Sequence, residues 1–335
     1  MKVLLQNRNS YLNSIAGDGI QILKTQEYLR KLQVEAEITS DPEADLAKYD
    51  LVHLFNLMPV EEIWPLFHNA FRQKKKIVLS PIFWNPNEFL SQSDGTAGLK
   101  SWWETSMELR QKLLLGVDLM LPNSLLELAV LKKHFQRLPA AQIVVNGVDR
   151  LFCHAKPDQF RRKYHGRDFI LSVGRICRRK NQLALIKAAR ALKLPLVLIG
   201  PLNDGLYYQE CRRASAGADV KFFDCLSQPE LSSAYAAARV HALVSWYDTP
   251  GLVSLEAALA CCAIVTTIRG SAKEYFGNLA YYCNPNSSES IQRALRNAWV
   301  APENLQLKTQ VFKNYIWEKT AEQTLRGYRT VLSVP

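Results

Sequence analysis

The chain has 335 residues, 48% of them hydrophobic, and a formal net charge of +11. This length favours two domains, each large enough to bury its own core. No apolar run reaches the roughly 18 residues of a membrane-spanning helix, and the start, MKVLLQNRNS, has too short an apolar part for a signal peptide. The seven cysteines lack CxxC spacing, which indicates neither a zinc site nor a disulfide framework. We therefore expect a cytoplasmic protein.

The excess of positive charge falls entirely in the second half. Residues 1–150 hold 17 Lys and Arg against 17 Asp and Glu, whereas residues 151–335 hold 25 against 14. A polyanion or a ligand with a diphosphate would suit such a domain. No basic stripe is interleaved with aromatic residues, so we expect no nucleic-acid partner.

The first half alternates short apolar runs with helical patterns such as those at 21–32 and 124–135. The apolar runs are Val3–Leu5, Leu51–Phe55, Ile77–Phe83, Leu119–Leu121 and Ile143–Val145. Strands separated by helices form βαβ units with a parallel sheet. Ser124 and Glu127 have the spacing of a capping box, which predicts the start of one helix.

A glycine pair, Gly17 and Gly19, follows the first strand. The predicted loop 16–19 precedes a helix, and a parallel sheet commonly binds ligands at such a position. A plain turn explains the same residues, so both interpretations stay open.

The second half repeats the alternation. Its apolar runs are Phe169–Val173, Leu196–Ile199, Val220–Phe223, Ala242–Val244, Ile264–Ile268 and Leu279–Cys283. Ser227 and Glu230 form another candidate capping box, before an Ala-rich helix. We expect a linker at 146–157 between two doubly wound α/β domains, with a ligand in the cleft between their strand ends.

A basic turn follows the first strand of this half. Gly174 precedes four cations within six residues, namely Arg175, Arg178, Arg179 and Lys180. Cations at a strand–helix turn are well placed to meet phosphate oxygens. A solvated basic loop is the competing interpretation.

The stretch 240–277 carries the strongest pattern. Its first apolar run breaks at 248–251 and continues as a segment that we interpret as a buried helix. Thr249 is the predicted N-cap, with Pro250 at the first helical position.

A second helix start is predicted after the following strand. Gly270 precedes Ser271, which has capping-box spacing to Glu274. Two helix N-termini at one edge of a sheet favour an anion, most commonly a phosphate.

Glu256 lies on an otherwise apolar stripe of the first of these helices. A buried carboxylate without partners costs several kcal/mol, so it must be engaged. A salt bridge or a backbone amide would satisfy it. The alternative is that it accepts hydrogen bonds from ligand hydroxyl groups, as acidic residues do with ribose.

In this combination the motifs resemble the family-4 retaining glycosyltransferases of the GT-B fold. The residues that carry the resemblance are Tyr49–His53, Asn146–Asp149 with Phe152, Ser172–Arg175 with Lys180, Val220–Phe222, Leu252–Ala257 and Gly270–Glu274. The resemblance implies two Rossmann-like α/β domains facing across a cleft. Residues 1–150 would form the acceptor side, residues 151–314 would bind the nucleotide sugar, and the last helix, about 315–335, would pack back on the first domain.

The resemblance also implies roles for single residues. Arg175 and Lys180 match the pair that contacts the donor diphosphate. Asp248 matches the first of two motif acids, beside the donor sugar, and Glu256 matches the second, which binds the ribose. The other implied donor-binding positions are Gly17, Gly19, Gly174, Gly251, Leu252, Val253, Gly270 and Ser271.

The chain departs from the family at three places. Asp248 is one methylene shorter than the usual Glu. The glycines that usually precede Glu274 are here Ser271 and Ala272, which makes the backbone less open. The His that usually follows the strand at 77–80 is absent, and His53 is as compatible with a core residue as with a catalytic one.

We expect a retaining, hexosyltransferase-like enzyme that uses a UDP- or GDP-linked sugar and a glycan, lipid-linked or protein acceptor. The sequence has no D-x-D motif and no His/Asp/Glu cluster with ligand spacing, so we expect no metal. Fixed cations and helix starts would offset the charge on the leaving diphosphate. With retention, a phosphate oxygen would take the acceptor proton.

Three other possibilities remain. A nucleotide-sugar epimerase of the same fold would use similar donor contacts. A catalytically silent partner of another glycosyltransferase would bind a nucleotide without transfer. Peripheral contact with the inner face of a membrane is an additional expectation from Lys74–Lys76 and Trp102–Trp103, although a solvated helix end explains the lysines equally well.

Overall fold

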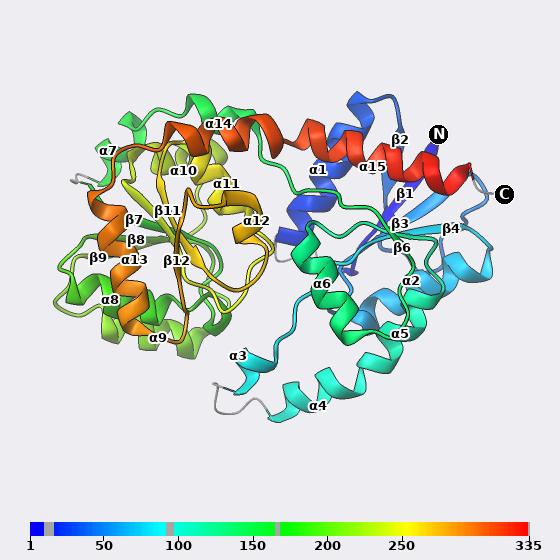
Figure 1. Ribbon diagram of the computed structural model, residues 1–335, viewed down its shortest axis with the longest axis horizontal. Helices are drawn as coiled ribbons and strands as arrows, with labels where there is room; N and C mark the ends of the chain where they lie inside the picture. The colour runs from blue at the N-terminus through cyan, green and yellow to red at the C-terminus, as the bar shows by residue number, and fades with distance from the viewer. Residues whose placement is uncertain (10–16, 92–96, 165–167, 334–335) are drawn as a thin grey trace. The chain divides into compact units, whose positions relative to one another are not determined.

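The computed structural model describes residues 1–9, 17–91, 97–164 and 168–333, which form two compact α/β units (Figure 1). Unit 1 comprises Met1–Gly147 and Trp317–Pro335, and unit 2 comprises Val148–Ile316. The sequence analysis places these divisions after residues 150 and 314. Each unit contains one parallel six-stranded sheet with helices, which confirms the predicted fold class.

Unit 1 is built on a parallel sheet with the strand order β2-β1-β3-β4-β5-β6. Its strands are β1 (Lys2–Gln6), β2 (Glu35–Ile38), β3 (Leu51–Phe55), β4 (Lys76–Ser80), β5 (Leu119–Met120) and β6 (Ala140–Ala141). The central strand β3 is buried along its whole length and β4 along all but its first residue, because helices cover both faces of the sheet. This burial explains why they read as continuous apolar runs rather than as an alternating pattern.

Seven α-helices of unit 1 lie within the described residues. They are α1 (Gly17–Lys31), α2 (Val60–Arg72), α3 (Asn87–Ser91), α4 (Ala97–Thr105), α5 (Met107–Leu115), α6 (Leu125–His134) and α15 (Trp317–Leu332). The last helix, α15, packs beside α1 (Figure 1). The buried Tyr328 of α15 also makes a 2.7 Å hydrogen bond to His53 in β3. This buried contact holds the carboxyl-terminal helix on the sheet of unit 1.

The prediction of a strand at Ile143–Val145 is wrong. Side chains of α15 satisfy the backbone there: Gln323 accepts from the Val145 amide at 2.9 Å, and Thr320 donates to the Val145 carbonyl at 2.8 Å. The Val144 amide still donates to the Pro122 carbonyl at 2.9 Å, but both backbone groups of Val145 are taken by the helix, so the pairing does not continue as a strand. The pairing falls instead at β6, and the edge strand β2 was missed because its Glu-Ala-Glu sequence is mostly polar.

Unit 2 has a second parallel sheet with the order β12-β11-β10-β7-β8-β9. Its strands are β7 (Ile170–Val173), β8 (Leu196–Ile199), β9 (Val220–Phe223), β10 (Val240–Leu243), β11 (Ala263–Thr267) and β12 (Tyr281–Cys283). The chain reverses its direction of winding at β7, which lies between β8 and β10. In doubly wound sheets, ligands bind beyond the strand ends at such a switch point.

Helices cover both faces of this sheet. They are α7 (Asp158–Tyr164), α8 (Gln182–Ala191), α9 (Gly205–Ala214), α10 (Gln228–Ala237), α11 (Leu252–Leu259), α12 (Ala272–Phe276), α13 (Ser288–Val300) and α14 (Leu305–Asn314), with the 3-10 helices η2 (Arg150–His154) and η3 (Arg178–Lys180). One layer contains α8, α9 and α13, and another contains α7, α10, α11 and α14. The predicted capping box of Ser227 and Glu230 is confirmed at the start of α10.

Candidate functional site

The turns after β10 and β11 are joined at the carboxyl end of the unit 2 sheet. Asp248 and Gly270 form a parallel β-bridge, and the Ser271 amide donates to the Asp248 carbonyl at 3.2 Å. Gly270 has a φ of +92°, and a Cβ at this position would lie 1.9 Å from the Asp248 carbonyl oxygen. Only glycine therefore allows the two turns to meet, and their contact fixes the backbone on either side of Asp248.

Lys180 and Asp248 form a buried ion pair at this edge. The Lys180 Nζ lies 2.8 Å from Oδ1 of Asp248, and the two side chains are 12% and 9% exposed. Burial alone would raise the pKa of Asp248, but Lys180 and Arg179 hold it below its ordinary value, so the carboxylate is ionised. Burial lowers the pKa of Lys180, and the attraction of Asp248 opposes that shift.

The second carboxylate oxygen of Asp248, Oδ2, is buried and makes no well-aligned hydrogen bond among the described residues, although the nearby Ser245 hydroxyl helps to lower the pKa of the carboxyl group. A buried acceptor in that condition costs about 1–3 kcal/mol unless water or a ligand satisfies it. The Arg179 guanidinium lies 3.8 Å from Oδ1 and donates to the Tyr247 carbonyl at 2.8 Å. The side chains of Lys180 and Arg179 thus lie beside a carboxylate whose second oxygen is buried.

The cations of the basic turn have different partners. Arg178 is held by Glu210 of α9 at 2.5 Å, and it lies 3.8 Å from Asp204. Lys180 and Arg179 instead face Asp248, and the half-exposed Arg175 makes contacts of its own. A freely solvated basic loop therefore does not describe this segment.

The predicted start of α11 is wrong by two residues. Its N-cap is Gly251, with a φ of +88°, and Pro250 lies before the helix. The bridge from Asp248 to Gly270 draws the chain towards the neighbouring strand, so Thr249 cannot take the capping position. No side chain of a described residue caps α11, so the first amide groups of the helix, at Leu252 and Val253, can serve a ligand.

The predicted capping box at α12 is also wrong. Ser271 is the N-cap, but its side chain makes no capping hydrogen bond, and its backbone is already helical, with φ −93° and ψ −4°. The amide of Ser271 is committed to the bridge with Asp248. At five residues, α12 is little more than one turn. The donor contacts predicted for Gly270 and Ser271 stay predictions.

Glu256 is half-buried in α11, and the hydroxyl group of Tyr235 donates to its Oε2 at 2.7 Å. This partner is a phenol on α10, whereas the structural interpretation of the sequence expected a salt bridge or a backbone amide. The sequence analysis missed Tyr235, because residues 235 and 256 belong to different helices and no local spacing connects them.

In unit 1, Gly17 and Gly19 lie in the first turn of α1, so the predicted loop at 17–19 is wrong, and Ala16 lies outside the described residues. Gly17 is exposed, and among the described residues outside its own helix nothing lies within 4 Å of a Cβ built there. Between the two glycines, Asp18 is 6% exposed and accepts from Arg8 and Asn56, both at 2.9 Å. These helical glycines remain predicted donor contacts.

His53 is a satisfied core residue. It is fully buried and hydrogen-bonded to Tyr328 at 2.7 Å and to Ser80 at 2.9 Å. Burial lowers its pKa to about 3, so the ring is neutral and has no spare nitrogen for chemistry. Of the two interpretations left open by the sequence, the structural one is correct.

Glu127 holds the segment that follows β4, where the family usually places its His. Its carboxylate accepts from the Phe83 amide and from the Asn123 amide, each at 2.6 Å. Ser124 caps α6 as predicted, by accepting from the Glu127 amide at 2.9 Å. The reciprocal half of the capping box is wrong, because the side chain of Glu127 serves two neighbouring loops instead of the Ser124 backbone.

Several of the residues that suggested membrane contact are engaged inside unit 1, whereas Lys74 is exposed. Trp103 is 3% exposed, and the buried Arg110 lies over the rings of Trp102 and Trp103 at 5.1 and 4.6 Å. Lys75 donates to the Tyr49 carbonyl at 2.8 Å. Within the described ranges, no helix is both long and apolar enough to span a bilayer.

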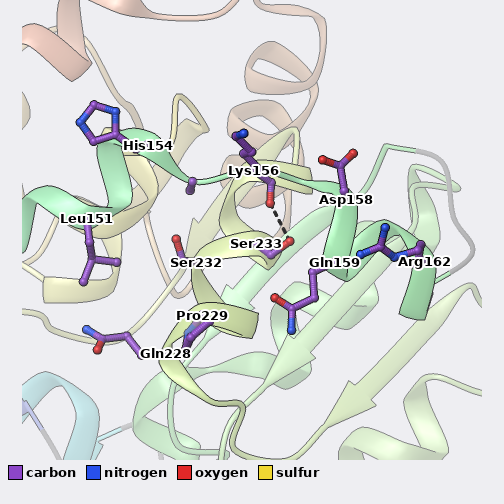
Figure 2. A pocket seen from close by; sticks show the side chains of 11 residues that line it. Leu151, His154, Lys156, Asp158, Gln159, Arg162, Gln228, Pro229, Ser232 and Ser233 are labelled. Atoms are coloured by element: carbon purple, nitrogen blue, oxygen red, sulfur yellow. Dashed lines mark hydrogen bonds between the residues drawn. The ribbon is translucent and has the colours of Figure 1, made fainter.

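A separate hollow of about 560 Å³ lies in unit 2 between η2, α7 and the start of α10 (Figure 2). It contains none of the predicted site residues, and its charged side chains, such as Lys156, Asp158 and Arg162, are exposed. Its floor includes the buried Ser232 and Ser233. Across the described part of the chain, no group of three or more His, Cys, Asp or Glu side chains could hold a metal ion.

Residues 155–309, nearly all of unit 2, match the family model described as Glycosyl transferases group 1. O-antigen chain mannosyltransferase B of Escherichia coli is 25% identical over 174 residues, which are 48% of this chain and 45% of that protein. Sulfoquinovosyl transferase SQD2 of Arabidopsis thaliana is 31% identical over 132 residues, 38% of this chain and 26% of that protein. The chain therefore matches less than half of the length of either relative.

Solved structures resemble the chain over its whole length. Sucrose-phosphate synthase from Thermosynechococcus elongatus has a TM-score of 0.81 at 16% identity, with 100% of both chains covered. Anabaena HepE, in complex with UDP and glucose, has a TM-score of 0.75 at 16% identity, again with 100% of both chains covered. At these identities the likeness shows the fold alone, and that fold is the predicted GT-B class.

Proposed function

We propose that this chain, whose residues 155–309 belong to the glycosyl transferases group 1 family, is a glycosyltransferase. It moves a sugar from a nucleotide-diphosphate donor to a glycan, lipid-linked or protein acceptor, with retention of anomeric configuration and without a metal. The relatives whose names state mannosyl and sulfoquinovosyl transfer support sugar transfer as the reaction class.

The observation that carries the proposal is the Lys180–Asp248 pair at the switch point of the unit 2 sheet. Lys180 and Arg179 provide positive charge, while the buried Oδ2 of Asp248 makes no well-aligned hydrogen bond within the described part of the chain. A ligand that suits both features has an anionic part and a hydroxyl group close together. A sugar joined to a diphosphate has this combination.

The chemistry assigned to these groups is electrostatic. As the bond from the anomeric carbon to the diphosphate oxygen breaks, negative charge grows on the leaving diphosphate. Lys180 and the first amide groups of α11 are fixed donors that offset it without reorganising, and Arg175 is assigned the same role from the family resemblance. The acceptor oxygen forms its bond on the same face, and a phosphate oxygen takes the acceptor proton, so the reaction needs no side-chain base.

A thermal-shift panel of sugar nucleotides tests donor binding. UDP-sugars come first because a structure of similar fold holds UDP, and GDP-sugars follow. A donor at 100 times its Kd stabilises the protein by about 2.7 kcal/mol. The shift should survive a chelator and disappear in Glu256→Ala and Arg175→Ala. If no sugar nucleotide gives a shift, the proposal loses its basis.

Product analysis tests the reaction itself. A donor that gives a shift is incubated alone and with candidate acceptors, and the anomeric configuration of the product is assigned by NMR. Transfer with retention is the expected result. An epimerised sugar nucleotide from the donor alone, or binding without transfer or slow hydrolysis, would contradict the proposal.

A further inference from the structure

The hydroxyl group of Tyr235 is committed to the Glu256 carboxylate. The two oxygens are 2.7 Å apart, and Tyr235 is fully buried in α10. Burial and the charge of Glu256 hold the pKa of Tyr235 well above its ordinary value, so the phenol stays protonated and donates. Hydrogen bonds to an ionised acceptor are roughly twice as strong as those between neutral groups.

The ring of Tyr235 is itself fixed. It packs edge-on against Phe152 of η2, with centroids 5.7 Å apart, and against the buried His241 of β10 at 5.8 Å. Packing on both sides leaves a two-torsion side chain no room to follow a moving carboxylate. The donor atom therefore has a defined position before any ligand arrives.

The helix that carries Tyr235 is also anchored. The buried Ser233 of α10 accepts from the Phe160 amide at 3.0 Å and donates to the Lys156 carbonyl at 2.7 Å, and Figure 2 shows the second of these bonds. These two bonds fasten α10 to the segment around α7. The phenol is thus presented from a rigid platform rather than from a loop.

We propose that Tyr235 is a positioning residue that sets the orientation of Glu256 for a ribose hydroxyl pair. A glutamate side chain has three rotatable bonds, and a ligand that has to order it loses affinity. The phenol orders it in advance by holding Oε2. This inference rests on the proposed function, because it takes Glu256 as the ribose acceptor.

If Tyr235 positions Glu256, removing its hydroxyl group should weaken some nucleotides more than others, whereas a role in packing alone would not. Without the phenol, affinity falls only for ligands whose ribose hydroxyl groups meet Glu256. A nucleotide that lacks the 2′- or 3′-hydroxyl group already forgoes part of that interaction and is affected less. General damage to α10 would weaken all of these nucleotides equally.

The test measures Kd by calorimetry for UDP and GDP and for their 2′-deoxy and 3′-deoxy forms. Tyr235→Phe removes only the hydroxyl group and should weaken the ribonucleotide about tenfold, with less than a twofold change for at least one deoxy form. Glu256→Gln should show the same selectivity. The double variant should be no weaker than Glu256→Gln alone, because both changes remove one interaction.

Tyr328→Phe is the matched control, since Tyr328 is an equally buried phenol with a 2.7 Å hydrogen bond, to His53 in unit 1. It should leave every Kd unchanged. Should Tyr235→Phe fail to fold, Phe152→Leu loosens the packing of the Tyr235 ring while leaving Glu256 in place, and it should give the same selective loss.

The outcomes separate the two claims. If the wild-type protein binds neither nucleotide, the proposed function fails. If it binds and Glu256→Gln weakens binding but Tyr235→Phe does not, the inference about Tyr235 is wrong and the proposed function stands. An equal loss for ribonucleotide and deoxynucleotides in Tyr235→Phe would also overturn the inference.

Discussion

Two buried carboxylates, Glu127 in unit 1 and Asp248 in unit 2, are ionisable groups near strand ends with opposite environments. Both oxygens of Glu127 accept backbone amides, and burial raises its pKa to about 7 despite them. Asp248 has a cation on one oxygen and no well-aligned hydrogen bond from a described residue on the other, and its pKa is lowered by Lys180, by Arg179 and by the nearby Ser245 hydroxyl. With both oxygens hydrogen-bonded to backbone amides, Glu127 holds two loops together. The ionised Asp248 is paired on one oxygen only, so its other oxygen can accept a hydrogen bond from a ligand.

The largest expected effect comes from removing the cation that keeps Asp248 ionised. Lys180→Ala should lower the rate of sugar transfer on the order of 100- to 1000-fold, because a fixed charge is lost where the diphosphate leaves. The measurement is kcat with saturating donor. Arg178→Ala is the matched control, since Arg178 pairs with Glu210, and it should lower the rate less than threefold. Equal losses of kcat in the two variants would show that Lys180 and Arg178 do not differ in their roles.

The next effect concerns the bridge that holds Asp248 in place. Gly270→Ala puts a methyl group 1.9 Å from the Asp248 carbonyl oxygen at a φ of +92°. Strain at such a backbone position costs about 1–3 kcal/mol before the clash is counted. Urea unfolding should therefore show a loss of about 3 kcal/mol. Gly217→Ala, also at positive φ but with nothing within 4 Å, is the control and should cost less.

The environment of Glu127 also predicts that the free energy of unfolding depends on pH. The pKa of Glu127 rises on folding from 4.5 to about 7, so the folded state holds the extra proton between these values. Its contribution to the free energy of unfolding is then fully present below pH 4.5 and is lost as the pH rises to about 7. The loss should be on the order of 3 kcal/mol, since one pKa unit corresponds to about 1.4 kcal/mol.

This dependence is measured as the difference between wild type and Glu127→Gln, by urea unfolding at pH 5 and pH 7.5. The comparison with the variant is needed because burial lowers the pKa of His53 and of His241 to about 3, which gives both a slope of opposite sign below pH 6.5. A difference that does not change with pH would show that Glu127 does not titrate in this range.

The smallest effect concerns the helix that carries Glu127. Ser124→Ala removes a cap whose side chain accepts from the Glu127 amide, and should destabilise unit 1 by about 1 kcal/mol. Thr249→Ala is the informative comparison, since the sequence predicts a cap there and the structure has none. A larger loss for Thr249→Ala in thermal unfolding would mean that α11 begins where the sequence places it.

The sequence alone determined the alternation of strands and helices and the caps at Ser124 and Ser227. These features depend on burial over a few residues and on hydrogen bonds between near neighbours, so local patterns predict them. The roles of Lys180 and Asp248 came from the family resemblance, and the structure brings these two residues together. Their roles, like those of Glu256 and the site glycines, remain to be tested.

Only the tertiary structure decided the features that depend on a distant partner. Gly251 rather than Thr249 caps α11 because Gly270, in the next turn of the sheet, holds Asp248. Residues 143–145 form no strand because α15 satisfies Val145, and Glu256 is engaged by Tyr235 from a neighbouring helix. In each case a backbone or carboxylate group was satisfied by residues far along the chain, and no local spacing contains that information.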